Sequence, residues 1–278
     1  MLLIDAKNLN YRSLNLKIKQ AVNLNKNTNR VIVLKNTAGQ RYIGDGIKGS
    51  TKIKIYGTPG NDLAAFMDGP EIEVFGNGQD AIGNTMNSGK IILHGDAGDI
   101  LGYSMRGGEI YVKGNVGWRS GIHMKSYLEK FPVIVIGGRA GNFLGEYMAG
   151  GVIIVLGLNL TVNNSKNINN IEKNTILKTF SSDKFFAYSD NSIVGDYTGT
   201  GMHGGIIYLK KDVGDYKIGR EVRKIVIDEK DVKFLELYLK NFCSYFNIDY
   251  KNTILKNFKD FIKLEPHSHR PYGRLYAY

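Results

Sequence analysis

One 19-residue unit occurs three times in succession in residues 53–109, "IKIYGTPGNDLAAFMDGPE IEVFGNGQDAIGNTMNSGK IILHGDAGDILGYSMRGGE". The first and third residues of each unit are aliphatic, whereas the residue between them is lysine, glutamate or isoleucine, so each unit opens with a predicted strand that buries one face. A glycine follows the strand. Seven residues later comes a small residue, and three residues after that a methionine. Nineteen residues with glycine corners are too few for a unit that contains a helix, and they suit one coil of a parallel β-helix.

The same unit extends in both directions along the chain. Further units begin at Ile110, Ile134 and Ile153, and a degenerate one begins at Ile32; the unit at Ile110 carries five extra residues. The unit at Ile153 stops after Gly157 and resumes at Val194. Every methionine except the first occupies the same slot, namely Met67, Met86, Met105, Met124, Met148 and Met202. We interpret this ladder as corner packing by thioethers rather than as a soft-metal site.

We therefore predict a mainly β protein, a single-stranded right-handed parallel β-helix of about 19-residue coils capped by C-terminal α-helices. Residues 1–31 are expected to form an N-terminal cap. Residues 32–220 form the β-helix domain, with an insertion at 158–191, and residues 221–278 form a helical cap and tail. Apolar side chains at helical spacing predict two helices at the C-terminal end. They are Val232, Leu235, Leu239, Phe242 and Phe246 in the first, and Ile254, Leu255, Phe258 and Phe261 in the second. Cys243 is expected to be a packing residue of the first helix.

The net charge of +11 lies in the flanks of the chain. Residues 1–54 hold 11 basic and 2 acidic side chains, whereas residues 55–125 hold 5 and 8. Without an aromatic and basic recognition module, this pattern favours an acidic partner subunit over nucleic acid. The absence of a leader and of a long apolar run predicts a cytoplasmic protein with no membrane contact. The single cysteine excludes internal disulfides and an iron–sulfur cluster held within the chain.

Several motifs imitate active sites. Gly76, Gly78 and Ala81 match a dinucleotide fingerprint with Asp96 twenty residues after Gly76, but the required helix has no room. Ser104 lacks the G-x-S-x-G context of a hydrolase and stands in a slot that also holds Thr85, His123 and Tyr147. We predict no catalytic, cofactor or metal residue on this chain. The residues proposed for partner docking are His203 and, in the tail, His267, His269, Arg270, Tyr272 and Arg274, because arginine and tyrosine are favoured interface anchors.

Taken in order, the motifs resemble a known family. "NTAGQRYIG" (36–44), "GNVGWRSGIHMK" (114–125), "GGRAGNFLGEYMAGGVIIVLG" (137–157) and "GTGMHGG" (199–205) are similar to the GXGXG domain, the C-terminal β-helix (domain 3) of the glutamate synthase large subunit, here as a free-standing chain. The family's catalytic cysteine and its FMN and iron–sulfur groups belong to other domains. The resemblance thus implies a non-catalytic scaffold in an oxidoreductase complex of nitrogen metabolism, with glutamine amidotransferase and FMN/Fe–S synthase subunits as partners.

Three alternatives stay open. The related β-helical subunit of formylmethanofuran dehydrogenase implies a scaffold for a molybdenum or tungsten enzyme. An autonomous esterase or hydrolase is the second alternative. The chain could also associate with itself, since the flat faces of a capped stack allow a homo-oligomer.

Overall fold

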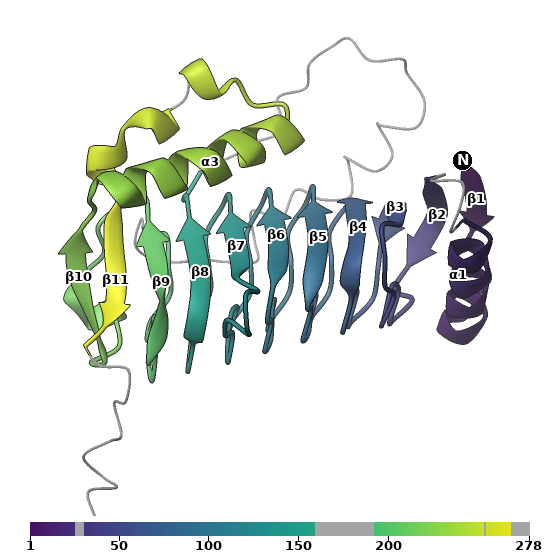
Figure 1. The fold of residues 1–278 in the computed structure, drawn as a ribbon, viewed down its shortest axis with the longest axis horizontal. Helices are drawn as coiled ribbons and strands as arrows, with labels where there is room; N and C mark the ends of the chain where they lie inside the picture. The colour runs from purple at the N-terminus through teal and green to yellow at the C-terminus, as the bar shows by residue number, and fades with distance from the viewer. Residues whose placement is uncertain (26–30, 159–191, 253, 268–278) are drawn as a thin grey trace, which may run out of the picture.

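The computed structural model describes residues 1–25, 31–158, 192–252 and 254–267. Its described residues form one sheet of eleven strands that stack side by side along the molecule (Figure 1), in the order β1-β2-β3-β4-β5-β6-β7-β8-β9-β11-β10. The strands are β1 (Leu2–Asp5), β2 (Ile32–Ala38), β3 (Lys52–Thr58), β4 (Asp68–Phe75), β5 (Ser88–Leu93), β6 (Gly108–Val112), β7 (Pro132–Ile136), β8 (Ala149–Val155), β9 (Gly204–Leu209), β10 (Val222–Val226) and β11 (Ile262–Pro266). The mainly β solenoid predicted from the 19-residue period is confirmed.

Strands β1 to β9 are parallel, and the repeat sets their register. Ile53 pairs with Ile72, Ile72 with Ile91, and the line continues to Ile207. These isoleucines and the aliphatic residues two positions later are fully buried in the interior of the solenoid. The unit resumes after the insertion as predicted, because Val194 bridges to Ala140 of the preceding coil.

The turn that closes each coil explains the small residue of the repeat. Three alternate residues of the turn have left-handed backbone, as in Asp62 (φ 59°), Ala64 (φ 61°) and Phe66 (φ 57°). The amides of the first and third donate to the next coil, at 3.0 Å to the Asp80 carbonyl and 2.8 Å to the Asn84 carbonyl, whereas Ala64 donates backwards. Glycine fills the middle position in later coils because it adopts this conformation without the cost, about 1–2 kcal/mol, that an L-residue incurs.

The methionine ladder lies in the interior. All six methionines of the slot are completely buried and belong to the same core as the strand isoleucines. Their flexible thioethers fill the space between the turn and the strands, so the packing interpretation is confirmed.

Aspartate and asparagine side chains tie the coils together at a second corner. Oδ1 of Asn77 accepts the Asp96 amide at 2.9 Å, Oδ1 of Asp96 accepts the Asn115 amide at 2.6 Å, and Oδ1 of Asn115 accepts the Arg139 amide at 2.9 Å. A Cβ on Gly114 would lie 2.1 Å from Oδ1 of Asp96. The glycine before each capped amide therefore makes room for the acceptor. Asp96, which a dinucleotide site would use to bind ribose, instead binds the next coil.

The C-terminal helix α3 (Glu229–Tyr245) is present, but it does not close the end of the stack as expected. It lies across the outer face of the strands in the C-terminal half (Figure 1), where Leu235, Leu239 and Phe242 are buried in a second core. The outward-facing strand residues of that core are Ile92, Tyr111, Val135, Ile154 and Tyr208. The helix removes this apolar outer face from water, which is favourable. The end of the stack is completed by further strands and does not need the helix as a cover.

The prediction of a second C-terminal helix is wrong. Three short 3-10 turns stand in its place, η2 (Tyr250–Asn252), η3 (Ile254–Lys256) and η4 (Phe258–Asp260), and β11 follows them. Strand β11 pairs antiparallel with both β9 and β10, so it completes the sheet at this end. Residues three apart lie on the same side of a 3-10 turn as well as of an α-helix. The spacing of the apolar residues in this segment therefore does not distinguish the two. Cys243 packs in the second core as predicted.

The N-terminal residues are more regular than expected. Strand β1 adds to β2, and helix α1 (Tyr11–Asn25) follows it at this end of the stack (Figure 1). Leu14, Ile18 and Ala21 of the helix are buried in the solenoid core. Only these few apolar positions mark the helix, among lysines and asparagines, so the sequence suggested an irregular wrap.

Candidate docking surfaces

The structure describes two of the residues predicted for docking. His203 is half-buried at the corner before β9, and its Nδ1 lies 3.2 Å from the Gly201 carbonyl oxygen. His267 is exposed directly after β11, and its backbone amide donates to the backbone carbonyl oxygen of Glu221 at 2.8 Å. Because β9 and β11 are antiparallel, both histidines stand at the same edge of the sheet. His269, Arg270, Tyr272 and Arg274 lie outside the described residues.

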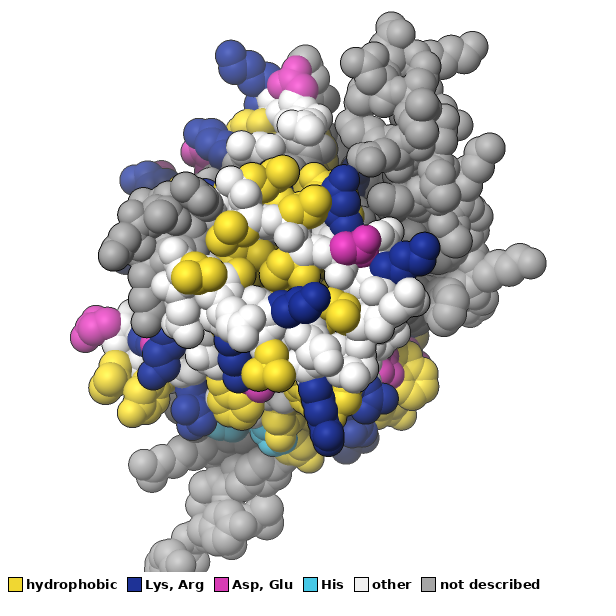
Figure 2. Space-filling model, turned by 90° about the vertical axis from the view of Figure 1, so that its right-hand side faces the viewer, with side chains coloured by type: hydrophobic (Ala, Val, Ile, Leu, Met, Phe, Trp, Pro, Cys, Tyr) yellow, Lys and Arg dark blue, Asp and Glu magenta, His cyan; other side chains and the backbone are white. Residues whose placement is uncertain are grey.

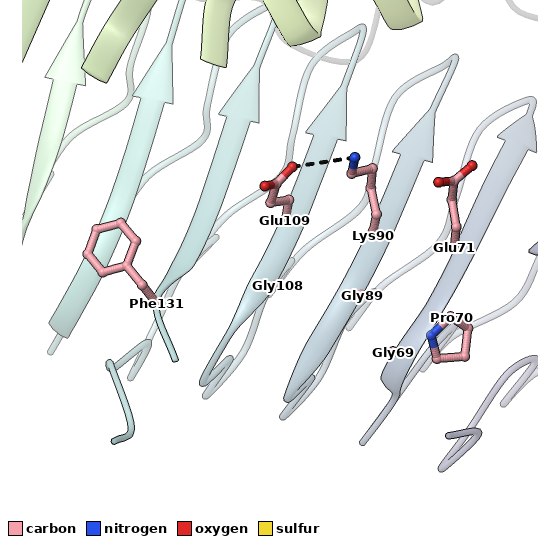
Figure 3. A pocket seen from close by; sticks show the side chains of 8 residues that line it. All are labelled: Gly69, Pro70, Glu71, Gly89, Lys90, Gly108, Glu109 and Phe131. Atoms are coloured by element: carbon pink, nitrogen blue, oxygen red, sulfur yellow. Dashed lines mark ion pairs between the residues drawn. The ribbon is translucent and has the colours of Figure 1, made fainter. Parts of the chain in front are cut away.

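The outer sheet face beyond α3 is charged rather than apolar. The residues that project from β3 to β6 in one line alternate in sign, as Lys52, Glu71, Lys90 and Glu109. Lys52 lies 3.4 Å from Glu71, and Lys90 lies 3.7 Å from Glu109 (Figure 3). Opposite charges on neighbouring strands stabilise each other across the ladder.

A shallow, open cavity of about 430 Å³ occupies this face at the start of the strands. Gly69, Gly89 and Gly108 lie along its floor, the charged line borders it, and Phe131 stands at its other side (Figure 3). Lys90 also donates a hydrogen bond to the Tyr245 hydroxyl at the end of α3. Burial lowers the pKa of Lys90, but Tyr245 and the neighbouring glutamates outweigh it and raise the pKa overall. Because its charges are paired, the cavity suits a polar contact surface better than an acid–base site.

A second line on the same face combines charge with stacked rings. Glu73 lies 2.9 Å from Nε2 of His94 and 3.1 Å from Nζ of Lys54. Phe75 stacks between Tyr56 (4.7 Å) and His94 (4.6 Å). The hydrogen bond from His94 is the largest influence on the pKa of Glu73 and lowers it; burial opposes this, and Lys54 adds to the lowering.

This arrangement predicts a pH dependence of stability. Because the folded protein holds the pKa of Glu73 below its unfolded value, ionised Glu73 stabilises the fold above that unfolded value, and this contribution disappears as the pH falls through the folded pKa. We expect Glu73→Gln to flatten the decline of the urea midpoint between about pH 5 and pH 3. Glu129→Gln, on an exposed loop, is the control and should follow the wild-type curve. Parallel curves for wild type and Glu73→Gln would refute the assignment.

The N-terminal end of the stack is the third notable surface. Figure 2 shows hydrophobic side chains there among scattered Lys and Arg and few acids. Leu3, Leu16 and Leu24 are exposed, and within the described ranges strand β1 has a neighbour on one side only. An open strand edge invites pairing with another chain. The acidic partner that the sequence analysis expects would bind basic residues such as these, and it stays a prediction.

Thiolate ligands for a metal or cluster are limited to one residue of the sequence. Its one cysteine, Cys243, is buried, and burial raises the pKa of the thiol to about 11. The residues of this chain therefore do not fit an iron–sulfur cluster, which is held by several cysteine thiolates. Among the described residues, no group of three or more His, Cys, Asp and Glu side chains gathers as a metal site would. Nor is any described helix long and apolar enough to span a bilayer.

Comparison with known proteins agrees with the repeat and its glycines. The GXGXG motif family matches residues 6–267. The uncharacterized protein MJ1350 of Methanocaldococcus jannaschii is 44% identical over 277 residues, which are 99% of this chain and 95% of that protein. With the parallel solenoid and its left-handed turns, these matches show that the chain belongs to the GXGXG motif family.

Proposed function

We propose that this chain is a non-catalytic scaffold subunit of a cytoplasmic complex of glutamate synthase type. It holds a glutamine amidotransferase subunit and an FMN- and iron–sulfur-containing synthase subunit at a fixed separation. The observation that carries the proposal is the GXGXG match along residues 6–267, because in glutamate synthase this domain accompanies those two activities without catalysing either.

The architecture suits a spacer. Each coil is hydrogen-bonded to both neighbours through the backbone of its turn and through the aspartate and asparagine caps. The solenoid is therefore stiff along its length, as repeat stacks with continuous cores are. Its outer sheet face, the turns of its coils and its N-terminal end are separate areas, so two partners can bind without competing.

Purification of the tagged full chain from its native source tests the proposal. We expect an amidotransferase and a flavin- and iron–sulfur-bearing subunit to co-purify in fixed ratio. Subunits with a molybdenum or tungsten pterin would instead support the formylmethanofuran dehydrogenase alternative. Recovery of neither set would overturn the proposal, as would turnover of glutamine or 2-oxoglutarate by the isolated chain. Ester hydrolysis abolished by Ser104→Ala would favour the hydrolase.

Reconstitution supplies a functional readout. Omitting this chain should lower glutamine-dependent glutamate formation by about tenfold or more, since the partners lose the high effective concentration that a common scaffold provides. Glutamate formation from added ammonium should persist, because it bypasses the amidotransferase. An equal loss of both activities would show that the chain acts on the synthase itself.

A further inference from the structure

The turns of three neighbouring coils carry large exposed side chains in an unfavourable backbone conformation. Arg119 (φ 55°), His123 (φ 56°), Tyr147 (φ 52°) and Tyr197 (φ 62°) are left-handed and exposed. Gly201, in the same slot as His123 and Tyr147, shows that glycine is compatible with this turn position. L-residues are strained there, and these side chains do not recover the cost by entering the core. Tyr42 and Phe66 are also exposed in this conformation, so what distinguishes these four side chains is that each contacts a ring of a neighbouring coil.

Ring contacts link the side chains of neighbouring coils in two stacks. The rings of His123 and Tyr147 stack at 5.4 Å with an interplanar angle of 11°, and Tyr103 contacts His123 edge-on at 6.0 Å. Tyr197 stacks on Phe143 in the same manner, at 5.0 Å and 13°.

Arg119 contacts the second of these stacks. Its guanidinium lies over the Phe143 ring at 5.1 Å, and its Nε lies 3.3 Å from the carboxylate of Glu146, which is almost completely buried. Trp118, half of it exposed, precedes Arg119. We call this area the aromatic turn surface, made of Tyr103, Trp118, Arg119, His123, Tyr147 and Tyr197.

The charge of the turns is opposite to that of the whole chain. The six turn segments are 58–67, 77–86, 96–105, 115–124, 139–148 and 194–202. They contain six acidic residues and two arginines but none of the 27 lysines of the sequence. Protein interfaces are enriched in aromatic residues and arginine and depleted in lysine. The acidic excess means that a partner with basic side chains is the complementary one.

The ring geometry favours a protein over a sugar or a nucleic acid. Sugars and bases bind by stacking on a free ring face. In this surface one face of each of His123, Tyr147 and Tyr197 is already stacked on a ring of the neighbouring coil, which leaves less free ring face for a base or a sugar. The rings therefore suit the mixed polar and apolar side chains of a folded protein better.

We propose that the aromatic turn surface is the docking site for a partner subunit that presents a basic, arginine-bearing surface. The proposal rests on the proposed function for the identity of the partner, the amidotransferase or the synthase subunit. The tyrosine hydroxyls of the surface accept hydrogen bonds from the arginines of that subunit. Two exposed aspartates supply negative charge, Asp99 on the turn of Tyr103 and Asp80 on the adjoining turn.

A triple variant separates this role from folding. Replacing His123, Tyr147 and Tyr197 by glycine removes the side chains and relieves the left-handed strain, so the thermal midpoint should stay level or rise. Affinity of the full-length variant for the purified partner should nevertheless fall by about 100-fold or more, since anchors of this type dominate interfaces. Tyr42→Gly is the matched control: Tyr42 is also exposed and left-handed (φ 61°), but it belongs to the first coil. It should bind like the wild type.

Each other outcome is decisive. Unchanged affinity in the triple variant overturns the docking site, whereas wild type that binds neither subunit overturns the proposed function instead. Hydroxyl-radical footprinting of the wild-type complex gives a readout without substitutions, because Trp118 should become protected. If the isolated wild type dimerises and the triple variant does not, the occupant is a second copy of the chain. If deleting residues 159–191 increases labelling of Trp118 in the isolated chain, that segment is the occupant. Either result overturns the proposal.

Discussion

Replacing Gly89 by alanine is expected to destabilise the protein by about 3–5 kcal/mol. Gly89 has φ +100°, where an L-residue is strained, and its new Cβ would lie 2.3 Å from the Pro70 carbonyl oxygen and 2.9 Å from the Gly69 carbonyl carbon. Both neighbours are backbone of the preceding coil and cannot rotate away. The coils must therefore separate locally. Urea denaturation followed by circular dichroism measures the loss.

Gly46→Ala is the control for conformation without crowding. Gly46 is also left-handed (φ +64°), but a Cβ there would meet nothing within 4 Å. Its expected cost is the conformational one alone, about 1 kcal/mol. Equal losses for Gly89→Ala and Gly46→Ala would show that the close stacking of coils is not what requires glycine at Gly89.

The second large effect is expected from Phe242→Ala in α3. Phe242 is fully buried between the helix and the sheet, and the tip of its ring lies over Gly137, where a Cβ would come within 2.7 Å of it. Removing a buried phenylalanine side chain costs about 3–5 kcal/mol. Because α3 is a separate layer on the solenoid, we expect its amides to lose hydrogen-exchange protection before those of the strands.

Leu237→Ala tests whether burial is the cause. Leu237 lies on the same helix with its side chain exposed, so its removal should change stability by less than about 0.5 kcal/mol. If Phe242→Ala destabilised strands and helix together, the helix would be an integral part of the solenoid's cooperative unit rather than a cover.

The coils could be predicted from the sequence because a stacked repeat places like residues on like. The stacked isoleucines from Ile53 to Ile207 and the repeated methionine position can both be recognised in the amino-acid sequence. The position of α3 could also have been inferred, but the signal was overlooked. The outward residue of the strands changes from Lys54 and Glu73 to Ile92 and Tyr111, which marks where a cover begins. The strand alternation alone predicts only that one face is buried, without saying where the other face is covered.

The docking residues were harder to predict. The slot of Ser104, His123 and Tyr147 varies in sequence, and variation alone suggested solvent-exposed positions without a role. Its significance depends on backbone angles and on stacking between coils, neither of which a single unit encodes. The residues predicted in the tail lie outside the described part of the chain, apart from His267, and their docking role stays a prediction.

The coil that is interrupted between Gly157 and Ile193 is a suitable place to insert another protein domain or a tag. Gly157 and Ile193 are in contact across the insertion, so closely that a Cβ on the glycine would lie 2.2 Å from Cγ2 of the isoleucine. A chain that leaves at one and returns at the other closes a loop whose entropic cost grows only logarithmically with its length. A fluorescent domain or an affinity tag placed between them should leave the coils on either side in register, which makes this corner the preferred position for a label.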